Sequence, residues 1–339
     1  MTVDGLSPPP PRAPYVDRAS GNWVLSRYAD VLRAFRDARL WPAGSRGEDQ
    51  GGGPRDDAGV LVERSGVQDS LSASRVDAWH AAVAPLALEL LQRLPTDRSV
   101  DLLRGFAMPW CLRLGRMVLG VSPGDGERLA ALAALAWPDT GWRRRLFVSR
   151  RRIGAAVAEL DRHFATAPVP MGRQTFVGTV QTLPRLLANG WLALFRAPAQ
   201  VARLRAQPDL MPRAVEELLR YAGIIPRLYR RATADVELDG VRLAAGARAT
   251  LMIASANRDP EQFPEPDVVD VSRPGAGQLS LGIGRGSCAG ARLVRMAFAV
   301  SIMAMLETFE HIAVAGETRW RSGHFCWPLA VPVVLRRQL

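Results

Sequence analysis

The sequence predicts a mainly α-helical protein with a smaller β-rich lobe, and three observations predict it. Apolar residues recur at helical spacing over most of the first two thirds of the chain. Farther on, apolar and polar residues alternate around Asp239-Gly240, a dipeptide typical of a tight hairpin turn. A Gly-rich loop that contains Cys288 then leads into one long apolar helix, expected over residues 289–309.

The elements are expected in this order from the N-terminus. Residues 21–41 begin as a short strand and become an amphipathic helix, with Val31, Leu32 and Phe35 on one face. Gly, Asp and Arg dominate residues 43–57, which predicts a loop. Helices are expected over residues 75–93, 101–119, 125–136 and 150–165, and Pro168 and Pro170 end the last of them.

A long apolar helix is expected over residues 174–197. It contains Gly178, Pro184 and Gly190, which predict a bent helix rather than a straight one. Two shorter helices are expected over residues 199–206 and 211–221. The alternating segment then predicts the strands of the β-rich lobe, before a coil at residues 263–267 and the Gly-rich loop.

Length and composition predict a single domain over residues 1–339, with a flexible N-terminal segment over residues 1–20. Hydrophobic residues make up 48% of the chain and charged residues only 23%, which argues against extended disorder. No apolar run approaches the roughly 20 residues that span a bilayer, and the first residues are polar and Pro-rich. We therefore expect a cytoplasmic protein.

Several function classes are disfavoured by composition. Cys111, Cys288 and Cys326 are too few and too scattered for a disulfide framework or a zinc site, and the histidines lack the spacing of a helical metal pair. The formal charge of +11 is compatible with nucleic-acid binding, but the arginines are dispersed rather than aligned with aromatic residues. We expect neither nucleic acid nor a membrane as a partner, and an acidic protein partner fits the charge better.

The segment LGIGRGSCAG, residues 281–290, carries the clearest chemistry. Its cysteine, Cys288, comes just before a helix N-terminus, where unpaired backbone N–H groups and the helix dipole favour thiolate over thiol. The glycines allow the backbone to approach a flat ligand and to donate hydrogen bonds to the sulfur. Taken alone, the loop leaves open a soft-metal ligand and a buried structural cysteine.

The loop matches the Phe-Gly-x-Gly-x-His/Arg-x-Cys-x-Gly signature at Gly282, Gly284, Cys288 and Gly290, whereas Leu281 and Gly286 depart from it. Upstream stand a Glu-x-x-Arg motif (Glu217 and Arg220) and then, in order, the segments RRAT at 230–233, ANRDP at 256–260 and FPEPD at 263–267. With RYADVLRAFRDARL near the start, the chain resembles a shortened bacterial cytochrome P450 over most of its length.

This resemblance implies the cytochrome P450 fold, with a bent central helix over haem b and the Cys loop before the last long helix. It implies that Cys288 binds the iron and that Leu281, Gly282, Gly284 and Gly290 lie around the cofactor. It also implies that Arg230 pairs with a haem propionate, and that Glu217 and Arg220 form a structural ion pair.

Two further segments depart from the family pattern, a helix and a coil. On the helix at 75–93, the family carries a His and an Arg four residues apart, and Val76 and His80 stand at these positions. His80 is a candidate partner of a propionate, and an ordinary partly buried histidine fits equally well. Val268 stands where a basic residue often locks the Glu-x-x-Arg pair, and Arg273 is a candidate substitute.

The central helix departs where the family carries an acid and a Thr that deliver protons. Val180 stands at the acid position and Gln181 at the Thr position, and neither relays a proton in the usual way. A helix bulge would bring Thr182 to the same place. The segment between the helix at 150–165 and the central helix is also short, which predicts an open pocket that admits a large or carrier-tethered substrate.

Three functions remain open from the sequence. The first is an oxidase or monooxygenase of a natural-product intermediate that receives electrons from a ferredoxin and its reductase. Arg285, Arg292 and Arg295 are the candidate docking residues for an acidic ferredoxin. The second is an atypical haem-thiolate enzyme that uses peroxide or catalyses oxidative coupling, cyclisation or rearrangement. The third is a non-catalytic recruitment module, against which the retained Cys288 argues.

Overall fold

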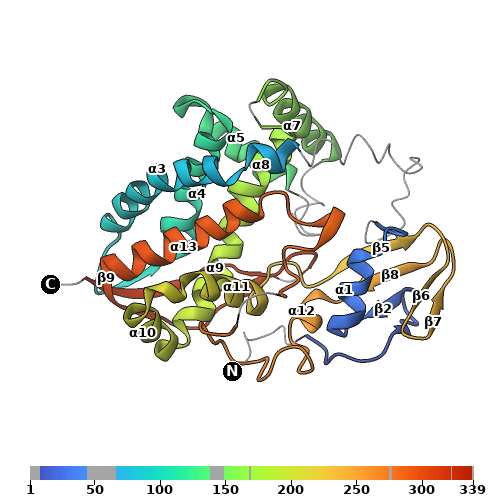
Figure 1. Cartoon of the computed structure of the whole chain (residues 1–339). Helices are drawn as coiled ribbons and strands as arrows, with labels where there is room; N and C mark the ends of the chain where they lie inside the picture. Colours follow the sequence, from blue (N-terminus) through green and yellow to red (C-terminus); the bar gives the residue numbers. More distant parts are fainter. Residues whose placement is uncertain are drawn as a thin grey trace.

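The fold is a helical body joined to a β-rich lobe, as Figure 1 shows. The computed structural model describes residues 8–43, 66–137, 149–167, 169–274, 277–321 and 323–337, without the side chain of Arg285. The loop expected at 43–57 therefore lies almost entirely outside the described residues. The helices are α1 (Tyr28–Arg36), α3 (Ala73–Gln92), α4 (Met108–Leu119), α5 (Pro123–Ala136), α7 (Arg150–His163), α8 (Gly172–Val177), α9 (Leu183–Phe195), α10 (Pro198–Ala206), α11 (Met211–Tyr221), α12 (Ile253–Ala256) and α13 (Ala291–Thr308).

Local sequence signals explain several helix ends. The Ser122 hydroxyl accepts a hydrogen bond from the Asp125 backbone N–H at 3.2 Å and caps α5, and Pro123 occupies its first turn. The Ser149 hydroxyl caps α7 in the same way. Gly120 ends α4 with a φ of 67°, a conformation that glycine adopts without strain.

The β-rich lobe is built around a five-stranded sheet with its own apolar core. Its strand order is β1 (Tyr15–Val16), β2 (Trp23–Leu25), β8 (Arg248–Leu251), β5 (Leu228–Ala232) and β3 (Leu40–Pro42). Strands β6 (Val236–Leu238) and β7 (Val241–Leu243) form the expected hairpin. Asp239 and Gly240 both have positive φ, 46° and 75°, as the tight turn requires.

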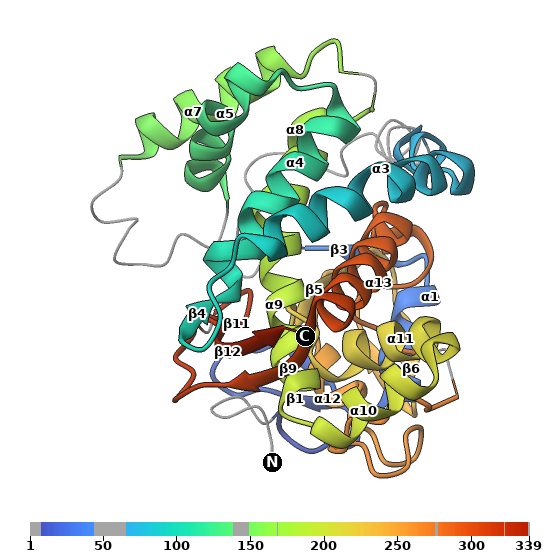
Figure 2. The same cartoon turned by 90° about the vertical axis from the view of Figure 1, so that its left-hand side faces the viewer.

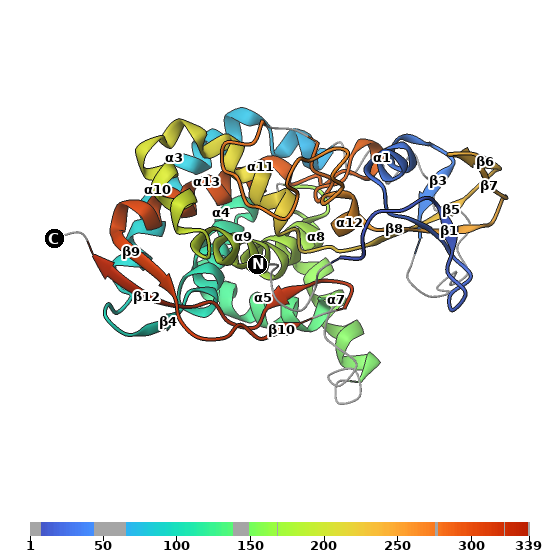
Figure 3. The ribbon, with the colours of Figure 1, turned by 90° about the horizontal axis from the view of Figure 1, so that it is seen from below.

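The C-terminal part of the chain contributes to two small sheets along one edge of the helical body, at the lower left in Figure 3. Strand β12 (Pro332–Arg337) lies between β4 (Ser99–Asp101) and β9 (Phe309–Val314), and β10 (Trp320–Arg321) pairs with β11 (Trp327–Pro328). All these pairings are antiparallel. Strand β12, near the C-terminus, thus pairs with β4, which lies much earlier in the sequence.

The central helix expected at 174–197 is present, but it is not a continuous α-helix. Helix α8 leads into a π-helical turn over Gly178–Thr182, and α9 follows. A π turn contains one more residue than an α turn, and such turns are frequent at functional sites. Pro184, which has no backbone N–H, follows the π turn directly, where the hydrogen-bond pattern of the helix changes.

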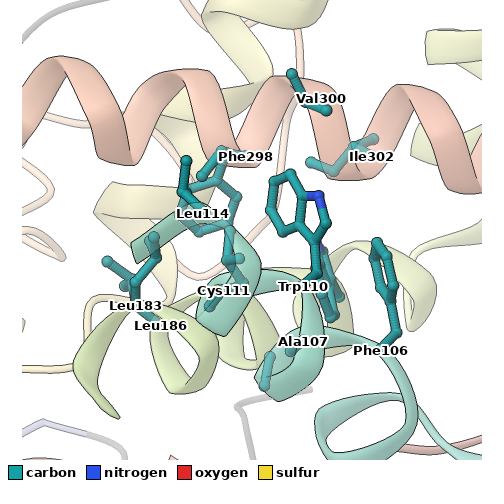
Figure 4. Packing of buried hydrophobic residues seen from close by; sticks show 14 of the residues in the cluster. Phe106, Ala107, Trp110, Cys111, Leu114, Leu183, Leu186, Phe298, Val300 and Ile302 are labelled. Atoms are coloured by element: carbon teal, nitrogen blue, oxygen red, sulfur yellow. The ribbon is translucent and has the colours of Figure 1, made fainter. Parts of the chain in front are cut away.

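Helix α9 is buried along its whole length and forms the axis of the main core. Figure 4 shows side chains of α4, α9 and α13 packed together, with Trp110 and Cys111 in the middle. The rings of Phe106 and Trp110 stack at 5.8 Å, and those of Phe106 and Trp191 at 5.4 Å. Cys111 is fully buried, and this burial raises the pKa of its thiol well above the ordinary value.

Helices α5 and α7 pack on one another at the edge of the body farthest from α10 (Figure 2). Helix α7 ends at His163 and α8 already begins at Gly172, so the connection is short, as expected. In the described part of the chain, none of the helices is both long and apolar enough to cross a membrane.

Candidate functional site

A cavity of about 340 Å³ lies between the central helix and the Cys loop. Leu281, Cys288, Ala289 and Gly290 line it on the loop side. The remaining walls come from the segment before α3, the central helix, the segment after α11 and the start of α13: Val67, Leu71, Met171, Gln174, Thr175, Gly178, Thr179, Thr182, Leu183, Leu186, Ile224, Ile225, Ser280, Leu293 and Val294. The lining is mainly apolar, as expected of a small-molecule site.

The Cys loop folds through its glycines. Gly282 and Gly284 have φ of 67° and 66°, and a Cβ on Gly282 would lie 3.0 Å from the Gly286 carbonyl oxygen. The backbone N–H of Cys288 donates a hydrogen bond to the Leu281 carbonyl at 2.6 Å, which closes the loop. Helix α13 begins at Ala291 directly afterwards, so the half-buried sulfur lies at its N-terminal end.

Arg230 reaches the same loop from the β-rich lobe. Strand β5 holds it between β3 and β8, and its side chain is 6% exposed. Its guanidinium carbon lies 5.3 Å from the centre of the Phe35 ring. A Cβ on Gly286 would lie 3.1 Å from Arg230 Nη2, so the guanidinium occupies the space beside the loop.

His80 is not brought to the cavity. It lies exposed on α3 and is not a lining residue, whereas Val76 on the same helix is buried in the core. The contact between His80 and a propionate stays a prediction. The buried face of α3 carries Val76, Val83 and Ala87, and the histidine lies on another face.

Glu217 and Arg220 form the expected ion pair on α11. Arg220 Nε and Nη2 lie 2.7 and 2.8 Å from the two carboxylate oxygens, and both side chains are almost fully buried. Arg273 Nε lies 3.0 Å from Glu217 Oε2, and its Nη1 donates to the Pro264 carbonyl at 2.6 Å. Arg273 thus holds the pair, while Val268 is exposed.

The side chains of the π turn differ in whether they line the cavity or pack elsewhere. Val180 is buried in the core and packs toward Gly115 of α4. Gln181 Nε2 donates to the Ala130 carbonyl of α5 at 3.3 Å. Neither residue lines the cavity, whereas Thr179 and Thr182 do. The bulge anticipated from the sequence is present at Gly178–Thr182, and the role of Thr182 in place of Gln181 stays a prediction.

Sequence reasoning missed Trp137. The indole Nε1 of Trp137, one residue after α5, donates a hydrogen bond to Thr182 Oγ1 at 3.1 Å. Trp137 also stacks on Phe325 with ring centres 5.2 Å apart and lies 4.9 Å from Trp327. Phe325 and Trp327 are therefore core residues and do not line the cavity. No motif marks a tryptophan at a helix end, so no sequence signal reveals this contact.

The comparisons with known proteins agree with this geometry. The family model described as Cytochrome P450 matches residues 202–327. Cytochrome P450-SU2 of Streptomyces griseolus is 33% identical over 338 residues, which cover 87% of this chain and 82% of the relative. The chain belongs to the cytochrome P450 family. It is accordingly an oxidoreductase whose cofactor is haem b.

Solved structures show the same P450 fold. The LnmA cytochrome P450 hydroxylase from the leinamycin pathway of Streptomyces atroolivaceus is 26% identical, with a TM-score of 0.76 and coverage of 92% of this chain and 90% of that one. P450BioI in complex with a ligated acyl carrier protein is 22% identical, with a TM-score of 0.78 and coverage of 93% of both chains.

The residues of this P450 suit a haem. A Cβ at Gly290 would lie 4.0 Å from Cys288 Sγ, so glycine keeps the space beside the sulfur open. The other two cysteines, Cys111 and Cys326, are buried outside the cavity. Among the residues that the structure describes, no group of three His, Cys, Asp or Glu side chains offers a competing metal site.

Proposed function

We propose that this P450 is a haem-thiolate monooxygenase or oxidase of a small-molecule intermediate in natural-product biosynthesis, with electrons supplied by a ferredoxin and its reductase. The observation that carries the proposal is one mainly apolar cavity that has Cys288 on one wall and Thr182 on another. Bound haem would supply oxygen activation there.

The side chains around the cavity have separate tasks in this proposal. Cys288 would hold the haem iron through its sulfur, and the glycines at 282, 284 and 290 would allow the loop to approach the ring. Arg230 holds a propionate, because it is a buried cation next to the loop. The apolar lining binds the substrate and excludes water, as Leu183 and Leu186 illustrate.

The substrate class is supported by the relatives and by the short connection at residues 164–171. LnmA is a hydroxylase of a natural-product pathway, and P450BioI binds a carrier protein that bears a fatty acid. A short connection covers less of the cavity than a long one, so it leaves room for a large or carrier-tethered substrate. The expected cytoplasmic location stays a prediction, which cell fractionation tests.

The ferredoxin is expected on the side of the Cys loop. Arg292 in the first turn of α13 is exposed, and Arg295 one turn later is partly exposed and pairs with Glu216. Both arginines therefore lie close to Cys288 along the chain and can contact an acidic partner. The side chain of Arg285 lies outside the described residues.

A second candidate function is an atypical haem-thiolate reaction: peroxide use, oxidative coupling, cyclisation or rearrangement. The observation that favours it is the cavity lining, which within the described residues contains no Asp, Glu or His. A proton must then come from a hydroxyl or from water, since none of the carboxylic acids that the structure describes lines the cavity.

The first experiment measures the spectrum of the reduced protein with carbon monoxide. A Soret band at the thiolate position that is lost in Cys288→Ala supports the haem-thiolate site, and an unchanged band contradicts it. The second experiment compares turnover of carrier-bound and free candidate substrates with ferredoxin and reductase or with peroxide. Turnover with peroxide alone would favour the second candidate over the first.

A further inference from the structure

The hydroxyl groups of the cavity differ in where their hydrogens are directed. Thr179 Oγ1 donates to the Thr175 carbonyl at 2.8 Å, and Ser280 Oγ donates to the Leu219 carbonyl at 2.6 Å. Both hydrogens are therefore used inside the protein. Thr182 differs from these two, because its oxygen accepts the hydrogen bond of Trp137, and no acceptor for its own hydrogen is found within the described residues. Thr175 also lines the cavity, but in the described part of the chain its hydroxyl has no such donor to orient it.

Within the described residues, Thr182 also makes no hydrogen bond to the carbonyl of the preceding turn. A helical threonine can donate to the carbonyl four residues earlier, as Thr179 does. For Thr182 this carbonyl belongs to Gly178, which accepts the Leu183 N–H that closes the π turn, and no bond from the Thr182 hydroxyl to it is found. Thr182 is a lining residue of the cavity, so an acceptor held there is the candidate partner for its hydrogen.

Trp137 is held firmly enough to fix this orientation. Its ring stacks on Phe325 and contacts Trp327. The Arg185 guanidinium also lies over the ring, with its carbon 4.3 Å from the ring centre. Trp137 is only 5% exposed. The indole N–H therefore has little freedom to leave Thr182, and the occupied lone pair restricts the hydroxyl rotor.

We propose that Trp137 is a positioning residue that turns the Thr182 hydroxyl into a hydrogen-bond donor toward an acceptor in the cavity. This inference rests on the proposed haem-thiolate site for its location. Under this proposal, the residue that follows α5 influences the chemistry at the central helix. The indole N–H of Trp137 orients the Thr182 hydroxyl, and the rest of the ring serves only in packing.

The core supplies a matched control for this pair. Trp191 Nε1 donates to Ser301 Oγ at 3.2 Å, and both groups are fully buried. Ser301 Oγ in turn donates to the Phe298 carbonyl at 3.0 Å, so its hydrogen is used internally. Trp191→Phe removes the same kind of indole–hydroxyl bond, but away from the cavity.

The test uses carbon monoxide as the probe on the dithionite-reduced, haem-loaded protein. The C–O stretching frequency is recorded for wild type, Trp137→Phe, Thr182→Val, the double variant and Trp191→Phe. A nearby hydrogen-bond donor lowers this frequency, so Thr182→Val should raise it. Trp137→Phe, which keeps an aromatic ring, should also raise the C–O stretching frequency. The double variant should raise the frequency no further than Thr182→Val does. Trp191→Phe should leave the frequency unchanged while lowering Tm.

An unchanged frequency in Trp137→Phe beside a shifted one in Thr182→Val would overturn the proposal, because Trp137 would then only pack. No shift in either variant would also overturn it, since Thr182 would not face the ligand. If the wild type shows no thiolate-type band at all, the proposed function fails instead. The indole ¹H–¹⁵N signal of Trp137 then decides: it must move in Thr182→Val of the haem-free protein while that of Trp191 stays, and an unmoved Trp137 signal contradicts the bond.

Discussion

The guanidinium of Arg230 and the backbone of Gly286 are so close that a Cβ at Gly286 would lie 3.1 Å from Arg230 Nη2. Gly286 stands where the P450 signature has a basic residue. The arginine of strand β5 thus occupies the space that a side chain at 286 needs. A side chain at 286 would therefore have to displace the end of the Arg230 side chain.

Gly286→Arg is therefore expected to lower both Tm and the fraction of protein that retains haem, because two guanidinium groups compete for one space. Arg230→Ala is expected to lower haem retention by removing the buried cation. The double variant Gly286→Arg with Arg230→Ala should retain more haem than Arg230→Ala alone, since the new arginine has room. Additive losses in the double variant would show that the two positions are independent. Haem content per protein and thermal melting measure both effects.

Thiol labelling should distinguish Cys288 from Cys111 by their reactivity. In native haem-free protein, a maleimide should modify Cys288, which is half-buried, but not Cys111, which is fully buried with its thiol pKa raised by burial. Bound haem should protect Cys288, and prior labelling should prevent haem binding. Mass spectrometry of peptides measures the modified sites. Equal labelling of Cys288 with and without haem would contradict its role as the ligand.

Arg273→Leu should destabilise the fold by about 1–3 kcal/mol, because Glu217 would lose a partner in a nearly dry environment. Arg203→Ala provides the control: Arg203 lies 3.4 Å from Asp270, but both side chains are well exposed, so about 0–1 kcal/mol is expected. Urea unfolding measures both. A loss for Arg273→Leu no larger than that for Arg203→Ala would show that Arg273 does not hold the Glu217–Arg220 pair.

Gly190→Ala should destabilise the core by about 1–3 kcal/mol, because a Cβ there would overlap the Phe298 ring, one of the side chains shown in Figure 4. Phe298→Leu should relieve part of this loss in the double variant. Gly154→Ala on α7 meets open space and should stabilise by about 0.4–1 kcal/mol. Opposite signs of the two glycine substitutions in urea unfolding are the expected result.

Much of the fold could be predicted because its signals are local. The hairpin at Asp239-Gly240 and the helix over Met211–Tyr221 were both expected where the structure has them. Proline and glycine in the central helix predicted a bent helix, and the alignment of Gln181 and Thr182 with the family suggested a local bulge; the π turn over Gly178–Thr182 is such a bulge. Hydrophobic periodicity does not identify a metal ligand. The resemblance to the P450 family indicated which cysteine is expected to bind the iron.

The site was less predictable because its contacts join distant segments. Trp137 and Thr182 are 45 residues apart, and Arg230 meets the Cys loop across the boundary between the lobe and the body. His80 was expected on the basis of aligned position alone, and the packing face of α3 leaves it exposed. Which side chain of a helix faces a cavity depends on the neighbours that cover its other faces.

The π turn over Gly178–Thr182 also has a consequence for how such enzymes are classified from genome data. A survey that scores each column of an alignment would find Gln181 in the hydroxyl column and count this chain among P450s without the group. Because Thr182 rather than Gln181 lines the cavity, a survey that follows the course of the backbone would find a threonine there that the alignment column does not show.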